Sequence, residues 1–340
     1  MITVEHLSKE FKAAVPKEGR LAGLRTLFSR DYKVKEAVRD VSFTIERGEF
    51  VGYIGPNGAG KSTTIKMLSG ILHPTAGEVR IAGMSPHRER RSVARMLGVL
   101  FGQRTQLWWD LPVRDSFDIL AAMYGVDEEK KLRRLAELSE LLALKPFMAT
   151  PVRKLSLGQR MRADIAAALL HDPDILFLDE PTIGLDVIAK RSIREFLHSI
   201  NRDLGKTILL TTHDMDDIEK LCSRVIVIND GRLGFDGTTD GLRRRIGLPT
   251  IIHVTYRSLV SPLIDGQFNP DGWPGQTAAE AQERQWPLRL TASDGQTLTV
   301  ECNRDQLSAM EALRLLEQLG EIEDVHMEEP DFEEIVHRVY

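Results

Sequence analysis

Residues 50–63 read FVGYIGPNGAGKST, and the prediction of the fold starts from them. The apolar run Phe50 to Ile54 predicts a strand, the glycine-rich run after it predicts a tight loop, and Lys61 to Leu68 predicts a helix. Backbone N–H groups in such a loop, at the N-terminus of a helix, bind phosphate groups. We therefore expect an α/β protein with a phosphate-binding loop.

Nine consecutive residues of this loop are the candidate nucleotide-binding residues. The glycines allow the backbone to approach the β- and γ-phosphates closely. Lys61 supplies a full positive charge, and the Ser62 hydroxyl is a candidate ligand of Mg²⁺. The nine residues are Gly55, Pro56, Asn57, Gly58, Ala59, Gly60, Lys61, Ser62 and Thr63.

A second apolar run ends in two acidic residues. Ile175 to Leu178 is followed by Asp179 and Glu180, as expected where a buried parallel strand reaches the carboxyl edge of its sheet. Ligands of open α/β sheets bind at this edge. Asp179 can hold Mg²⁺ through water, and Glu180 can polarise an attacking water as a general base.

The rest of the chain predicts two domains. Apolar strands alternate with helical patterns, which predicts a mostly parallel sheet covered by helices. The segment from about Pro112 to Leu144 is helical in pattern and belongs to a predicted helical subdomain at about residues 104–172. The composition changes after Leu248, so we place a boundary near residue 247, between a domain of residues 1–247 and an accessory domain of residues 248–340.

The accessory domain is predicted to be a small α+β unit. The sequence alternates like a hairpin around Asp294 and Gly295. A helix is expected from Arg304 to Leu319, a strand from Ile322 to Met327, and a last helix after Pro330.

Composition narrows the class of function. With 340 residues, 42% hydrophobic and 28% charged, the chain has the composition of a globular protein. A net charge of −5 and a pI near 6 argue against nucleic acid as the main partner.

Cys222 and Cys302 lack the spacing of a disulfide framework or a zinc site. The N-terminus lacks a signal-peptide pattern, and no apolar run of about 18 residues occurs, so a cytoplasmic chain is expected whose membrane role comes through a partner.

A third motif, LSLGQ at Leu155 to Gln159, opens a predicted helix before the acidic pair. The order of phosphate-binding loop, LSLGQ, acidic pair, GLD at Gly184 to Asp186 and an isolated His213 after a strand resembles the ATP-binding subunits of ABC transporters. The resemblance covers about residues 1–240. It implies a P-loop NTPase fold of the ABC type that binds and hydrolyses ATP with Mg²⁺.

The resemblance also implies that two such subunits pair head to tail, in the simplest case as a homodimer. The signature segment would then close on ATP held by the phosphate-binding loop of the opposite subunit. Leu157 stands where the family more often has glycine, so the backbone is less free there. Asp186 resembles the D-loop residue that couples the two sites. The signature segment consists of Leu155, Ser156, Leu157, Gly158 and Gln159.

Three further residues take their roles from the resemblance. His213 resembles the switch histidine that contacts the γ-phosphate and holds the catalytic geometry. Gln103 aligns with the glutamine that senses Mg²⁺ and faces the membrane subunit, with Gln106 as a weaker alternative. Phe11, placed at the end of the first strand, matches the aromatic residue that stacks on adenine, and Tyr32 competes with it for this role.

Two segments are candidates for contacts outside the nucleotide site. Trp108 and Trp109 lie where the family receives the coupling helix of its permease, although packing within the helical subdomain is the alternative. The segment Ala13 to Lys35 is longer than the family core needs and carries six basic and two acidic residues. Contact with a membrane surface and a solvated extension of an edge hairpin are both open for it. Its apolar residues at near-helical spacing are Leu21, Leu24, Leu27 and Phe28.

The predicted function is to power transport through separate transmembrane permease subunits, at the cytoplasmic face of the membrane. The single nucleotide domain, the GLD form and the tail from Val325 to Ile335 resemble subunits of drug and polysaccharide exporters, so export is predicted. An importer ATPase is the alternative. A soluble ABC ATPase acting on ribosomes or DNA is disfavoured because neither a second nucleotide domain nor a coiled-coil insertion is visible. The presence of Lys61, Glu180 and His213 disfavours a regulator without turnover.

Overall fold

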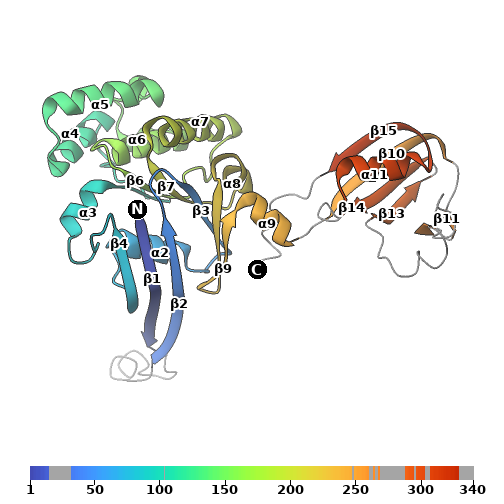
Figure 1. Cartoon of the computed structure of the whole chain (residues 1–340). Coiled ribbons are helices and arrows are strands. Elements are labelled where there is room, and N and C mark those ends of the chain that lie inside the picture. Colours follow the sequence, from blue (N-terminus) through green and yellow to red (C-terminus); the bar gives the residue numbers. More distant parts are fainter. Residues whose placement is uncertain are drawn as a thin grey trace, which may run out of the picture. The chain divides into compact units, whose positions relative to one another are not determined.

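The computed structural model of the chain describes residues 1–14, 32–102, 104–246, 249–259, 263–264, 267–268, 288–294, 296–302 and 307–328. The chain divides into two compact units, residues 1–239 and 240–338 (Figure 1). The predicted boundary near residue 247 lies a few residues beyond this division, where the chain is not described. The domain assignment therefore stays a prediction.

A six-stranded sheet, in the order β5-β6-β7-β3-β8-β9, forms the centre of the first unit (Figure 1). Its strands run parallel except for β9, which pairs antiparallel with β8. The apolar runs seen in the sequence form the inner strands, because a parallel sheet covered on both faces buries both sides of each strand. The predicted α/β fold with a mostly parallel sheet is confirmed. The strands are β3 (Phe50–Ile54), β5 (Leu97–Phe101), β6 (Ile175–Asp179), β7 (Thr207–Thr211), β8 (Arg224–Asn229) and β9 (Arg232–Thr238).

A second, antiparallel sheet has the order β2-β1-β4. Its strands are β1 (Ile2–Ala14), β2 (Tyr32–Ile45) and β4 (Ala76–Ile81). Phe11 was expected at the end of the first strand, but β1 continues to Ala14 and pairs Phe11 with Lys35 inside the strand. Register shifts between Val4 and Glu10 break the alternation of side chains, which is why the sequence pattern did not reveal the longer strand.

Helices cover both faces of the six-stranded sheet. The helix α2 (Lys61–Leu68) packs between the two sheets, where Ile65, Met67 and Leu68 are fully buried among residues of both. Figure 1 shows α6 and α7 on the opposite side of the six-stranded sheet. Among the described residues, no helix combines the length and the apolar character needed to span a membrane. Besides α2, the helices around the sheet are α3 (Arg90–Met96), α6 (Leu157–Leu169), α7 (Val187–Leu204) and α8 (Met215–Leu221).

The predicted helical middle consists of two helices, α4 (Val113–Tyr124) and α5 (Glu128–Leu141), which lie beside α6 (Figure 1). The chain turns between them because Gly125 ends α4 in the left-handed conformation, at a φ of 69°. Asp127 then caps α5 by accepting a hydrogen bond from the Lys130 N–H at 2.9 Å. Short 3₁₀ turns follow at Lys145–Phe147 and Val152–Lys154.

The second unit contains an antiparallel sheet in the order β13-β14-β10-β15, and α11 packs against it. The helix begins at Ala309, later than the predicted Arg304, because Ser308 and Glu311 form a capping box at its N-terminus. The predicted hairpin is present as β13 and β14. Gly295 and the predicted helix after Pro330 lie outside the described residues. The elements are α9 (Thr239–Ile246), β10 (Thr250–Leu259), β11 (Leu263–Ile264), β12 (Gln267–Phe268), β13 (Leu288–Asp294), β14 (Thr297–Cys302), α11 (Ala309–Glu317) and β15 (Gly320–Glu328).

Candidate functional site

The phosphate-binding loop connects β3 to α2, as the sequence predicts. Gly60, the last residue before α2, has a φ of 108°, and a Cβ atom there would lie 2.4 Å from the carbonyl oxygen of Ala37. Only glycine combines that backbone conformation with so close an approach. The Ala59 carbonyl accepts a hydrogen bond from the Gly231 N–H at 3.1 Å, so contacts with β2 and with the β8–β9 turn hold the loop.

Lys61 brings the positive charge of the loop into a buried position. Its side chain is 6% exposed, and its Nζ donates hydrogen bonds to the carbonyl oxygens of Gly55 at 2.5 Å and Pro56 at 3.2 Å. Burial lowers the pKa of Lys61, and the carboxylates of Glu180 and Asp179 oppose that shift. The loop and the acidic end of β6 therefore form one electrostatic unit.

Asp179 ends β6 beside the first turn of α2. Its Oδ1 accepts hydrogen bonds from the Thr211 hydroxyl at 2.5 Å and the Ser62 hydroxyl at 3.4 Å. Hydroxyl and carboxylate oxygens are the donors that Mg²⁺ prefers, so these residues fit the predicted metal. The described residues contain no group of three or more His, Cys, Asp or Glu side chains that could hold a metal ion by themselves. A magnesium ion that takes other ligands from phosphates and water fits this arrangement.

Glu180 and His213 lie in direct contact at the carboxyl edge of the sheet. The distance between Glu180 Oε1 and His213 Nε2 is 2.6 Å. Glu180 has a φ of 55°, a conformation that residues other than glycine rarely adopt and that is often found at functional sites. Its N–H donates a hydrogen bond to the Thr211 carbonyl at 2.8 Å, which keeps the residue next to the loop that carries His213.

The signature segment forms the N-terminus of α6. Ser156 caps the helix and forms a capping box with Gln159, with hydrogen bonds of 3.2 and 3.0 Å. Leu157 is the first helical residue, and its Cδ2 lies 3.0 Å from where a Cβ of Gly184 would stand. Asp186, the predicted D-loop residue, caps α7 by accepting a hydrogen bond from the Ala189 N–H at 2.8 Å. The signature segment and the D-loop are thus neighbours within one chain.

The structure does not join the signature segment to the phosphate-binding loop. Within the described part of the chain, no hydrogen bond or ion pair links Leu155–Gln159 to Gly55–Thr63. The role of the signature segment at a second copy stays a prediction.

Only one of the two candidate glutamines, Gln106, lies among the described residues. Gln103 lies outside the described residues. Gln106 is described, and its Nε2 donates a hydrogen bond to the Asp164 carbonyl at 3.0 Å. The Asp164 carboxylate accepts further hydrogen bonds from the Thr105 hydroxyl at 2.8 Å and the Gln106 N–H at 3.1 Å. Asp164, on the signature helix, therefore fastens the loop that follows β5.

Sequence reasoning missed Asp164. The residue is 4% exposed, and its burial raises the pKa of the carboxyl group to about 6, against the effect of its hydrogen bonds and of Arg160. An acidic residue within the apolar run of α6 was the signal that could have revealed it, since charged side chains are seldom fully buried without partners.

Asp164→Asn is expected to change how stability depends on pH. Between pH 3.8 and about 6 the folded state holds more protons than the unfolded state, so the free energy of unfolding falls as the pH rises. The asparagine variant lacks this loss, of about 3 kcal/mol in total. The free energy of unfolding of the variant minus that of the parent should therefore be larger at pH 8 than at pH 4. Urea denaturation of both proteins at each pH measures this difference. If the free energy of unfolding of the two proteins changed in parallel with pH, the raised pKa of the buried Asp164 carboxyl group would be contradicted.

Phe11 is half-exposed on β1, and the Nζ of Lys9 lies 5.4 Å from its ring centroid. On the neighbouring strand β2, residues 33–36 and Arg39 line a cavity of about 770 Å³ that reaches Gly58 of the phosphate-binding loop. The side chain of Tyr32 lies outside the described residues, as do residues 15–31 of the basic segment with Leu21, Leu24, Leu27 and Phe28. Adenine stacking on Phe11 stays a prediction.

Comparisons with known proteins agree with this arrangement. A family model described as ABC transporter matches residues 38–183. The chain is 37% identical to the ABC transporter ATP-binding protein NatA of Bacillus subtilis (strain 168), over 63% of this chain and 87% of that protein. It is 39% identical to the Nod factor export ATP-binding protein I of Burkholderia orbicola (strain AU 1054), over 62% of this chain and 69% of that protein. It is 35% identical to the methionine import ATP-binding protein MetN of Latilactobacillus sakei subsp. sakei (strain 23K), over 64% of each.

A solved structure extends the similarity to the backbone. The dimeric post-hydrolysis state of the ATP-binding cassette MJ0796, bound to ADP and Pi, has a TM-score of 0.59 and 27% sequence identity to this chain. The match covers 70% of this chain and 98% of that one.

Proposed function

Because the chain belongs to the ATP-binding subunits of ABC transporters, we propose that it powers export through separate transmembrane permease subunits, at the cytoplasmic face of the membrane. It is an ABC ATPase that binds and hydrolyses ATP and energises transport. The observation that carries the proposed site is the meeting of three segments at one edge of the sheet. Ser62 contacts Asp179 there at 3.4 Å, and Glu180 contacts His213 at 2.6 Å.

The geometry supports a distinct role for each residue. Lys61 and the N–H groups of the loop hold the phosphates, as a helix N-terminus with a lysine does in other phosphate sites. Glu180 accepts the proton of the attacking water, and His213 orients Glu180 and contacts the γ-phosphate. Ser62 and Asp179 would hold Mg²⁺, with the undescribed Gln103 as a further ligand. Bound magnesium neutralises charge on the phosphates.

We also propose that two copies of the chain form the complete site. Among the described residues, no hydrogen bond or ion pair joins the signature segment to its own phosphate-binding loop, and the similar cassette MJ0796 is dimeric. The N-terminus of α6, capped by Ser156, would place its N–H groups at the γ-phosphate held by the partner copy.

Trp108 and Trp109 are the proposed contacts with the permease. They are 38% and 50% exposed, so packing within the helical subdomain covers only part of each ring. The guanidinium carbon of Arg160 lies 5.7 Å from the ring centroid of Trp109. Because Arg160 belongs to α6, this contact joins the proposed docking surface to the helix that begins with the signature segment.

Trp109→Ala is expected to weaken the complex with the permease by about 30-fold, because removal of a central aromatic anchor costs about 2 kcal/mol at an interface. Binding of the chain to its detergent-solubilised permease measures the effect. Leu132→Ala, on α5, is the control, since Leu132 is also an exposed apolar residue of the helical subdomain. Unchanged affinity of the Trp109 variant would place the permease on another surface.

The direction of transport has a specific alternative, which is import. Export is supported by the relative named for Nod factor export and by the resemblance of the tail to exporter subunits. Import is the second candidate because a relative is named for methionine import. Vesicles in which the reconstituted complex exposes this chain to the outside separate the two. ATP added outside drives an exporter to accumulate cargo in the lumen, whereas an importer would deplete it.

A further inference from the structure

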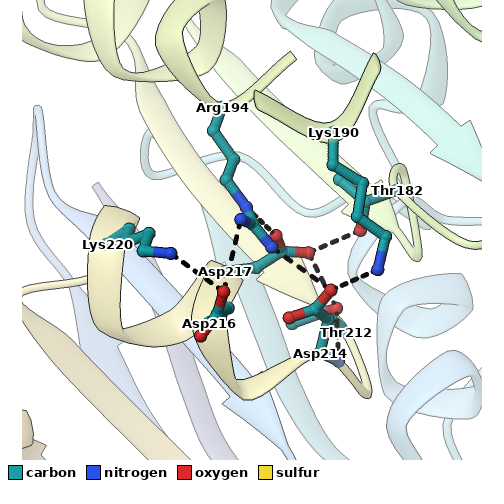
Figure 2. Close-up of polar contacts among 8 residues, drawn as sticks. All are labelled: Thr182, Lys190, Arg194, Thr212, Asp214, Asp216, Asp217 and Lys220. Carbon is teal, nitrogen blue, oxygen red and sulfur yellow. Dashed lines mark hydrogen bonds and ion pairs between the residues drawn. The ribbon is translucent and has the colours of Figure 1, made fainter. Parts of the chain in front are cut away.

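A buried carboxylate, Asp217 on α8, joins the two loops that carry the proposed catalytic residues Glu180 and His213. Asp217 is fully buried, and its Oδ1 accepts a hydrogen bond from Arg194 Nε. Its Oδ2 accepts two more, from the Thr182 hydroxyl at 2.5 Å and the Thr212 hydroxyl at 3.1 Å. Figure 2 shows these side chains converging on Asp217. We call Asp217, Arg194, Thr182 and Thr212 the Asp217 cluster.

The partners of Asp217 come from the segments that the reaction uses. Thr182 follows Glu180 in the loop after β6, and Thr212 immediately precedes His213 in the loop after β7. Arg194 lies on α7, the helix that Asp186 caps. A single carboxylate oxygen therefore fixes the two loops relative to each other.

The residue on the other side of His213 is also held in place. Asp214 Oδ2 forms ion pairs with Lys190 at 2.5 Å and with Arg194 at 3.2 Å (Figure 2). The Asp214 N–H donates a hydrogen bond to the Thr212 hydroxyl at 3.0 Å. Both chain neighbours of His213 are thus anchored to α7 or α8, while the imidazole itself contacts Glu180.

Stability alone gives a weak reason for such a cluster. A buried ion pair must overcome the desolvation of both groups, and a well-packed apolar pair of similar size is often at least as stable. A fully hydrogen-bonded buried cluster does, however, give a unique and rigid geometry. Rigidity matters here because a displacement of about 1 Å in a catalytic group can reduce the rate about 100-fold.

We propose that Asp217 is a positioning residue for ATP hydrolysis, which holds the loop of Glu180 and the loop of His213 at the separation that catalysis needs. It touches neither the nucleotide nor the reacting water, and it acts through Thr182 and Thr212. The inference rests on the proposed roles of Glu180 and His213. It concerns turnover and not ATP binding, because no member of the Asp217 cluster belongs to the phosphate-binding loop.

The first test is Asp217→Asn in the full chain. Turnover of ATP is expected to fall about 10- to 100-fold, because the amide binds Arg194 and the two hydroxyls less firmly. The KM for ATP should change by less than about threefold, since the phosphate contacts are untouched. An equal loss in binding and turnover, or turnover like that of the parent, would overturn the proposal.

Asp216→Asn is the matched control. Asp216 is the preceding residue on α8, and it pairs with Lys220 at 2.8 Å and with Arg194 at 3.6 Å, but it contacts neither threonine. Its side chain is more than half exposed. The same chemical change at this position should leave turnover within about twofold of the parent, since surface substitutions of this kind have small effects.

Two milder variants keep the test decisive if Asp217→Asn fails to fold. Thr182→Val and Thr212→Val each remove one hydroxyl and leave the Asp217–Arg194 ion pair in place. Turnover is expected to fall about 3- to 10-fold in the Thr182 variant, the equivalent of one lost hydrogen bond. The Thr212 variant should lose at least as much, because its hydroxyl also accepts the hydrogen bond from the Asp214 N–H. Parental turnover in both would overturn the proposal.

A double-mutant cycle with His213→Ala separates a positioning role from a general structural one. If Asp217 acts partly through His213, Asp217→Asn should lower turnover by clearly less in the His213→Ala background than in the parent. A full additional loss would show that it acts by another route. Parental turnover of His213→Ala alone would instead refute the proposed role of His213, whatever Asp217→Asn does.

Discussion

Replacement of Glu180 by glutamine is expected to lower the turnover of ATP by about 10²- to 10⁴-fold while ATP binding is retained, because this is the contribution of a positioned general base. Glutamine keeps the size of the side chain but accepts no proton from water. The hydrogen bond from the Glu180 N–H to the Thr211 carbonyl, at 2.8 Å, involves only the backbone, so the loop should keep its place. The loss is therefore chemical and leaves the fold intact.

Phosphate release at saturating ATP and equilibrium binding of a fluorescent ATP analogue measure turnover and binding separately. Glu195→Gln is the control, since Glu195 is an exposed carboxylate on α7 that pairs with Arg191 at 2.8 Å. Parental turnover of the Glu180 variant would assign the base to another group. The stalled variant should also elute as a dimer in the presence of ATP. Elution as a monomer would count against the dimer without affecting the assignment of the base.

Replacement of Lys61 by alanine is expected to weaken ATP binding itself by about 10- to 150-fold, which corresponds to the loss of one charged hydrogen bond of about 1.5–3 kcal/mol. The ammonium group is the cation that offsets Asp179 and Glu180 at the end of β6. Without it, the two carboxylates face the phosphates with one positive charge fewer. Repulsion therefore adds to the lost contact.

Isothermal titration with ATP measures this affinity. Lys66→Ala is the matched control, because Lys66 lies on the same helix, carries the same charge and is exposed. The Lys66 variant should bind ATP with nearly the affinity of the parent. An unchanged affinity in the Lys61 variant would mean that the loop does not hold the phosphates.

The sequence predicted the main elements of the fold because their signals are local. The apolar runs that form β3, β6 and β7 stand out by composition, and the phosphate-binding loop by spacing alone. The prediction of β1 was wrong at its C-terminal end, and Phe11 lies inside the strand. Bulges between Val4 and Glu10 remove the alternation on which a strand is recognised, and only pairing with β2 holds the longer strand together.

The sequence by itself determined the chemistry that this protein carries: a lysine and a serine on a phosphate-binding loop, two acids at the end of a strand, and a histidine after another strand. These residue types and their order are properties of the chain, and no contact is needed to read them. Only the tertiary structure decided which residues hold them in place. Asp179 meets Ser62 across 117 positions, Asp164 meets Gln106 across 58, and Asp217 meets Thr182 across 35. Contacts at such separations leave no periodic pattern, because they arise where packed elements bring unrelated segments together.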